Sequence, residues 1–193
     1  MVPDLRAARS PPFGPRSRWP AETAGMTDPG APYQVLPVSP AEWIQYRDIR
    51  LRALAEAPSA FGSSWELERV RPDAAWRERT VASPERQTWS ARSSQAWVGL
   101  VAAVREEDDQ LQLVSMWVDP IWRRRGVARG LIAAVVAWWR PDPGAGLHLW
   151  VSSDNVAALA CYQAEGFRLT GVRLSLPSDP SRSRVEMRFS EPG

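Results

Sequence analysis

Short apolar runs, several of them alternating with polar residues, mark strands along the first 118 positions of the chain. Four runs indicate β-strands, at residues 33–38, 87–91, 95–105 and 111–118. A helix is predicted from Ser39 to about Ala57, because Ser39-Pro40-Ala41-Glu42 combines an N-cap residue, a first-turn proline and an acid. A second, short helix is predicted from Asp73 to before Pro84. The last three strands follow one another closely, which predicts an antiparallel meander.

After Pro120 the period of the pattern changes to about 3.6 residues. Apolar side chains then share one helical face until the break at 141–144: Val127, Leu131, Ile132, Val135, Val136 and Trp139. A strand-like run at 147–151 follows, so a right-handed crossover should place it parallel to the run before Pro120. A second helix at 155–165, closed by Gly166, precedes strands near 167–174 and 185–189. The pattern predicts an α/β fold with a mixed sheet, in which a crossover helix joins the meander to a parallel strand pair.

The length of 193 residues and an apolar share of 44% predict one catalytic domain, at residues 34–193. Residues 1–33 carry seven prolines, scattered arginines and almost no apolar periodicity. Such a segment buries too little surface to offset chain ordering, so we expect a disordered, Pro/Arg-rich N-terminal extension. Met26 could be the natural start, and a Pro-rich docking peptide is the alternative interpretation.

Composition narrows the function classes. The formal net charge of +2 gives no general affinity for nucleic acid, and all 24 basic residues are arginine, so no lysine can act as a base or form an imine. One cysteine and one histidine exclude an internal disulfide framework and leave few soft metal ligands, so we expect no metal. We also expect no membrane span, because no apolar stretch approaches about 18 residues. A reducing, cytoplasmic location is predicted.

A glycine turn opens the crossover helix. Gly126 follows Arg123-Arg124-Arg125 and precedes Val127-Ala128, so backbone N–H groups at the helix start could hold a pyrophosphate. Glycine and alanine at 126 and 128 leave room for phosphate oxygens. An ordinary turn flanked by solvated arginines is the alternative interpretation.

The second helix carries a polar residue and a phenol on one face. Asn155 and Tyr162 lie seven residues apart, nearly two turns, with Ala158 between them. A phenol, with a pKa near 10, could donate a proton to a departing thiolate, with a pKa near 8.5. A helix cap and a half-buried aromatic are the alternatives. Cys161 should point about 100° away from Tyr162, which argues against a thiol acyl carrier.

These motifs, in this order, resemble the GNAT superfamily of acyl-CoA-dependent N-acyltransferases over about residues 34–190, which implies a GNAT-like three-layer fold. The resemblance implies acetyl-CoA as co-substrate, without a metal. On the strand at Met116-Trp117-Val118 it implies that the amides of Met116 and Val118 bond the acetyl carbonyl and the pantetheine arm. It further implies that the turn at residues 123–128 binds the pyrophosphate and that Asn155 hydrogen-bonds the CoA arm. Tyr162 is implied to be the acid that protonates the leaving thiolate. The implied acceptor is a primary amine of a small molecule or peptide, and a homodimer is possible.

The general base is not assigned by the resemblance. In the ribosomal-protein alanine acetyltransferases a glutamate precedes the asparagine by five positions, whereas this chain has Trp150 there. A water chain and four side chains are the candidates: His148, Asp119, Glu66 and Glu68. Glu66 and Glu68 could also attract a cationic amine near residues 50–64, the expected acceptor wall.

Four tryptophans are possible linings of the acceptor pocket, and core packing is their alternative role: Trp43, Trp65, Trp117 and Trp150. We favour direct acetyl transfer from acetyl-CoA to a primary amine whose identity the sequence leaves open. The alternative is a catalytically silent acyl-CoA-binding regulatory module.

Overall fold

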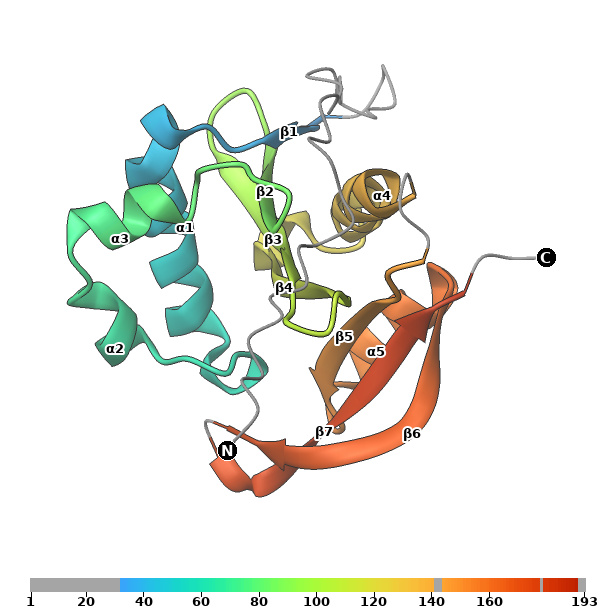
Figure 1. The fold of residues 1–193 in the computed structure, drawn as a ribbon. Helices are drawn as coiled ribbons and strands as arrows, with labels where there is room; N and C mark the ends of the chain where they lie inside the picture. Colours follow the sequence, from blue (N-terminus) through green and yellow to red (C-terminus); the bar gives the residue numbers. More distant parts are fainter. Residues whose placement is uncertain (1–31, 141–143, 178, 191–193) are drawn as a thin grey trace, which may run out of the picture.

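A mixed seven-stranded sheet with strand order β1-β2-β3-β4-β5-β7-β6 runs through the molecule (Figure 1). The computed structural model describes residues 32–140, 144–177 and 179–190, so the predicted extension at 1–33 lies almost entirely outside the described residues. The strands are β1 (Gln34–Pro37), β2 (Arg86–Arg92), β3 (Trp97–Arg105), β4 (Leu111–Val118), β5 (Leu147–Ser152), β6 (Phe167–Leu176) and β7 (Asp179–Phe189). The predicted α/β class, the meander β2-β3-β4 and the parallel β4–β5 pair are confirmed.

Helices cover both faces of the sheet, which gives the predicted three layers (Figure 1). One face carries α1 (Trp43–Glu56), α2 (Trp65–Arg69) and α3 (Asp73–Glu78), and the other carries α4 (Val127–Trp139) and α5 (Val156–Ala164). Short 3-10 turns are η1 (Pro40–Glu42), η2 (Pro58–Ala60) and η3 (Pro120–Trp122). On β3, Leu100 packs in the core under α1 and Val101 in the core under α4, because successive side chains point to opposite faces. In the described residues, no helix is long and apolar enough to cross a bilayer.

Helix α4 matches its prediction in position and face. All six apolar residues predicted to share a face are buried. The helix ends before the break at residue 141, as the sequence indicates. The 3.6-residue apolar period of this helix extends over several turns, and the folded protein keeps the helix that this local pattern predicts.

Helix α2 was missed by the sequence reading. It has five residues, too few to show a helical period, and it begins where the Ser64 side chain accepts from the Leu67 N–H at 3.3 Å. Its inner side chain, Glu68, is 1% exposed and binds Arg50 at 3.1 Å and Arg79 at 2.8 Å. The short helix is therefore held by a buried ion-paired network.

Replacing Glu68 by glutamine should destabilise the fold by about 3–5 kcal/mol at neutral pH, because Arg50 would remain buried without its anion. Burial opposes ionisation of Glu68, but hydrogen bonds and charge from Arg50 and Arg79 outweigh it and hold its pKa below 4.5. The contribution of a carboxylate with a lowered pKa is present above pH 4.5 and is lost as the pH falls through the folded-state value. Urea unfolding of the variant and wild type at pH 7 and pH 4 should therefore show a smaller difference at pH 4.

The exposed Glu66 on the same helix provides the control, and Glu66→Gln should shift the unfolding midpoint far less than Glu68→Gln does. An equal, pH-independent loss in both variants would contradict the role assigned to the buried network.

Strands β4 and β5 pair over only three positions before they part. Leu111–Leu113 of β4 lie opposite Leu147–Leu149 of β5, and no pairing continues from Val114 onward. Ser115 has a left-handed backbone with φ of 60°, and the β3–β4 register shifts beside it. This bulge bends β4 away from β5. The sheet therefore opens at the carboxyl ends of the two strands.

Candidate functional site

A cleft of about 660 Å³ occupies the opening between β4 and β5. Its volume is within the range of small-molecule sites. The walls are the end of α1 with η2, the second half of β4, the turn before α4, the end of β5 and the inner face of α5. Ten of the eleven residues predicted from sequence line this cleft: Met116, Trp117, Val118, Arg123, Arg124, Gly126, Val127, Ala128, Asn155 and Tyr162.

The end of β4 offers a backbone donor to the cleft. The Asp119 N–H donates to the Val98 carbonyl on β3 at 2.9 Å, and successive residues of a strand direct their N–H groups to opposite sides. The N–H of Val118, which lies opposite Gly99, therefore faces away from β3 and toward the opening. Arg123 Nε donates to the carbonyl of Val118 at 3.0 Å. The turn thus fixes the strand end whose N–H could bond a thioester oxygen.

The turn before α4 has the geometry of an anion site. Gly126 is the N-cap residue with φ of +80°, a left-handed conformation in which any side chain is strained. The first bond inside the helix runs from the Gly130 N–H to the Gly126 carbonyl, so the N–H groups of residues 127–129 have no partner in the helix. Gly126, Val127 and Ala128 line the cleft. A pyrophosphate fits this turn because free amides and the positive end of the helix dipole coincide there.

The three consecutive arginines have different environments. Arg123 donates to the Glu56 carboxylate at 2.8 Å, and Arg125 lies over the Trp122 ring at 5.3 Å. Arg125 does not line the cleft, whereas Arg124, with φ of 63°, does. Within the described residues, the guanidinium of Arg124 has neither an ion pair nor a hydrogen bond. Of the three, Arg124 is therefore the arginine that best fits a phosphate group.

Asn155 caps a helix and also lines the cleft. Its Oδ1 accepts from the Ala158 N–H at 3.1 Å, so it caps α5. The side chain also lines the cleft, and its Nδ2 makes no hydrogen bond to the part of the chain that is described. The cap fixes the side chain while the amide donor stays available to a ligand.

Tyr162 lies deep in the same wall. Its ring packs edge-on against Phe167 with 5.7 Å between centroids, and the residue is 8% exposed. Burial raises the pKa of the phenol well above its usual range, so the hydroxyl keeps its proton at any working pH. A phenol with a raised pKa is a poor source of a complete proton for a thiolate. It can still donate a hydrogen bond to a leaving sulfur.

His148 lies away from the cleft. It is buried at the start of β5, where its Nε2 is 2.9 Å from a Glu106 oxygen and its Nδ1 is 3.3 Å from a Glu186 oxygen. The cleft begins at Trp150, at the other end of that strand. His148 is therefore not positioned to act as the base.

The three acidic candidates also lie outside the cleft. Glu68 is enclosed in its ion-paired network, and Glu66 is exposed on α2. Asp119 caps η3 by accepting from the Ile121 N–H at 3.1 Å. None of the residues named from sequence as a base lines the cleft.

Glu56 is the acidic residue that sequence reasoning missed. It is the only carboxylate among the described residues that line the cleft. Its Oε2 accepts from the indole Nε1 of Trp117 at 2.9 Å and from Arg123 at 2.8 Å, and its side chain is one third exposed. Because the same guanidinium also bonds the Val118 carbonyl, Glu56 lies beside the end of β4. The sequence feature that could have identified Glu56 is its position at the end of the first helix, just before Pro58.

Two of the four tryptophans predicted to line an acceptor pocket lie in the cleft, and two do not. Trp117 and Trp150 line the cleft, whereas Trp43 packs beside the core under α1 and Trp65 is exposed on α2. Cys161 also lines the cleft, contrary to the expectation from its helical position. Burial, with a contribution from Glu165, raises the pKa of this thiol, so it is held in its unreactive protonated form. Among the described residues, no three potential ligands cluster as a metal site would require.

Comparisons with known proteins find relatives of this chain in sequence and in fold. A sequence model described as "Acetyltransferase (GNAT) family" matches residues 50–167. N-acetyltransferase 8 of Homo sapiens is 33% identical over 88 residues, 43% of this chain and 39% of that protein. N-alpha-acetyltransferase RimI of Mycobacterium tuberculosis is 33% identical over 105 residues, 53% of this chain and 64% of that protein. The chain thus spans less than two thirds of either relative.

A solved structure shares the fold. The crystal structure of Arabidopsis thaliana NAA60 in complex with acetyl-CoA superposes with a TM-score of 0.61 and 18% identity. The superposition covers 83% of this chain and 99% of the NAA60 chain. At this identity the similarity concerns the fold alone.

Proposed function

Because the chain belongs to the acetyltransferase (GNAT) family, we propose that it transfers an acetyl group from acetyl-CoA to a primary amine of a small molecule or peptide. One observation carries the proposal: a single cleft combines the free strand end at Val118, the helix N-terminus behind Gly126 and the α5 face with Asn155 and Tyr162. An anion site, an amide donor and a phenol in one cleft suit an acyl thioester of a diphosphate-bearing cofactor.

Different residues of the cleft would bind different parts of the cofactor. The amides after Gly126, together with Arg124, would bind the pyrophosphate. The Nδ2 of Asn155 would donate to the pantetheine arm, and the N–H of Val118 would stabilise the thioester oxygen as charge develops on it. Tyr162 would donate a hydrogen bond to the leaving sulfur.

Glu56 would receive the acceptor amine. The protonated amine gives one proton to the Glu56 carboxylate, directly or through one water, and its nitrogen then attacks the thioester carbon. The N–C bond forms, the C–S bond breaks, and the second nitrogen proton leaves with the CoA thiol. Glu56 returns its proton to solvent. No covalent enzyme intermediate is needed, consistent with the protonated state of Cys161.

Acetyl-CoA at 100 times its dissociation constant should stabilise the protein by about 2.7 kcal/mol, because it binds only the folded chain. Gly126→Glu should abolish this stabilisation, since a carboxylate would occupy the phosphate site on a strained backbone. Thermal melts with acetyl-CoA, CoA and ATP measure the effect.

Gly171→Glu is the matched control, because Gly171 on β6 also has a positive φ, +89°, and an added Cβ there would meet nothing within 4 Å. This variant should keep the shift given by acetyl-CoA. Release of free thiol with a panel of amines then separates an enzyme from a silent acyl-CoA-binding module. Stabilisation without thiol release on any amine would favour the silent module.

A further inference from the structure

Arg184 on β7 lies beside the carboxyl end of β5, whose Trp150 and Ser152 line the cleft, although Arg184 itself is not among the lining residues. It pairs with Ser152 of β5, and residues directly opposite in an antiparallel pair share a face with Cβ atoms about 5 Å apart. Ser152 and Trp150, two residues apart on that face, both line the cleft. The Arg184 guanidinium lies over the Trp150 ring at 4.5 Å from the centroid. The arginine is therefore held against the cleft wall by its contact with Trp150.

The charge of Arg184 is not matched by the protein. Its Nε is buried without a hydrogen-bond partner, and no ion pair involves it among the described residues. A buried guanidinium donor without an acceptor is costly, and because Nε is enclosed an external anion would have to bind the terminal nitrogens of the group. Stacking on Trp150 leaves the two terminal nitrogens, which are not among the buried atoms, to donate from the edge of the guanidinium plane.

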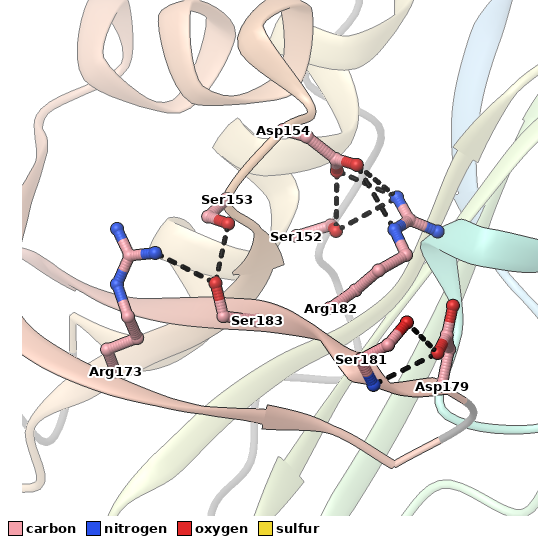
Figure 2. Close-up of polar contacts among 8 residues, drawn as sticks. All are labelled: Ser152, Ser153, Asp154, Arg173, Asp179, Ser181, Arg182 and Ser183. Carbon is pink, nitrogen blue, oxygen red and sulfur yellow. Dashed lines mark hydrogen bonds and ion pairs between the residues drawn. The ribbon is translucent and has the colours of Figure 1, made fainter.

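Neighbouring arginines on the same strand pair do have partners (Figure 2). Arg182 binds the Asp154 carboxylate at 2.6 Å, and Arg173 donates to the Ser183 hydroxyl at 2.8 Å. The Arg182 contact ties β7 to the loop before Asn155. The Arg182–Asp154 ion pair therefore holds β7, which carries Arg184, close to the elements that line the cleft.

The carboxylate two residues further along the same strand face is already engaged. Glu186 accepts from the Thr170 hydroxyl at 2.8 Å and contacts His148 at 3.3 Å and Arg188 at 3.4 Å. Among the described residues Arg184 thus has no anionic partner, while Glu56 supplies a negative charge on the α1 side of the cleft.

We propose that the acceptor is an amine that carries a carboxylate, and that Arg184 binds this carboxylate while Glu56 receives the amine. The inference rests on the proposed acetyl transfer and names its substrate class as amino acids and their ω-amino homologues. A guanidinium binds a carboxylate through two parallel N–H donors, which fixes the orientation of the acceptor as well as its charge. The amine end is then directed toward the thioester. Arg184 is a binding residue and takes no part in bond breaking.

The experiment compares matched pairs of acceptors. Glycine, β-alanine, 4-aminobutyrate and 6-aminohexanoate are each assayed against their carboxamides, with propylamine as a simple amine, by free-thiol release from acetyl-CoA. The series varies the distance between the amine and the carboxylate, and each carboxamide removes only the charge. The acid of the best-fitting length should exceed its amide in kcat/KM by about 10- to 100-fold, the usual effect of a hydrogen-bonded charge.

Arg184→Gln should remove this preference by raising KM for the acid about 10- to 100-fold with little change in kcat, and leave the carboxamide unaffected. Arg184→Lys should recover part of it. Arg173→Gln is the control, because Arg173 lies opposite Val185 and therefore on the other face of the strand pair. Retention of the acetyl-CoA thermal shift shows that each variant is folded.

Equal kcat/KM for acids and amides would overturn the inference, as would a preference that survives in Arg184→Gln. Turnover of propylamine but of no acid would also overturn it while leaving the acetyltransferase function standing. Failure of every amine, propylamine included, would count against the proposed function itself.

Discussion

Replacing Glu56 by glutamine should lower kcat/KM at pH 7 by about 10²- to 10³-fold. An alkylamine with a pKa near 10 is about one part in 10³ unprotonated at pH 7, so an enzyme without a proton acceptor depends on that small fraction. Glutamine retains an oxygen that can accept from Trp117 Nε1 and Arg123, so the packing of the cleft should persist. Affinity for acetyl-CoA should therefore be unchanged.

The pH profile identifies the role of Glu56. The rate of Glu56→Gln should rise about tenfold per pH unit and approach the wild-type rate near pH 10, because the free amine replaces the missing base. A purely structural role would give a deficit that is constant with pH. Asp119→Asn is the matched control, since Asp119 is an acidic residue close to the end of β4 that does not line the cleft. A wild-type rate at pH 7 in Glu56→Gln would remove Glu56 from the proton transfer.

Removing the phenol oxygen in Tyr162→Phe should slow acetyl transfer by about 10²- to 10³-fold, the usual effect of losing one preorganised donor at a centre of developing charge. The ring contact with Phe167 is kept, so the fold and the cofactor affinity should change little. Because burial raises the pKa of Tyr162, its hydroxyl stays protonated through the working range. The deficit should therefore be the same from pH 6 to pH 9, unlike that of Glu56→Gln.

Single-turnover measurement with saturating acceptor is the appropriate assay for Tyr162, because slow product release would hide part of the effect in the steady state. Tyr46→Phe is a matched control, since Tyr46 is 1% exposed and packs in the core under α1, away from the cleft. Equal single-turnover rates for wild type and Tyr162→Phe would leave Tyr162 as a packing residue.

Local signals were sufficient to predict the elements that we propose position the cofactor. Gly126 opens α4 at the predicted glycine turn, and Asn155 caps α5, which was one of the two interpretations of its position. Helix caps, glycine turns and apolar periods depend on residues within about four positions of each other. The order of these elements was also enough to predict the parallel β4–β5 pair, because crossover connections have one handedness.

The partners of individual charges were decided by the tertiary structure alone. Glu56 meets Trp117 and Arg123 across 61 and 67 residues of sequence, and no local pattern encodes such a contact. The same holds for Arg124, distinguished from Arg123 and Arg125 only by what their side chains meet, and for Arg184 on Trp150. Strand pairing and helix packing bring these groups together only when the whole sheet forms. Local patterns and their order along the chain were therefore enough to predict the fold class and the elements around the cleft, while long-range packing placed Glu56 in the cleft wall and Arg184 on Trp150.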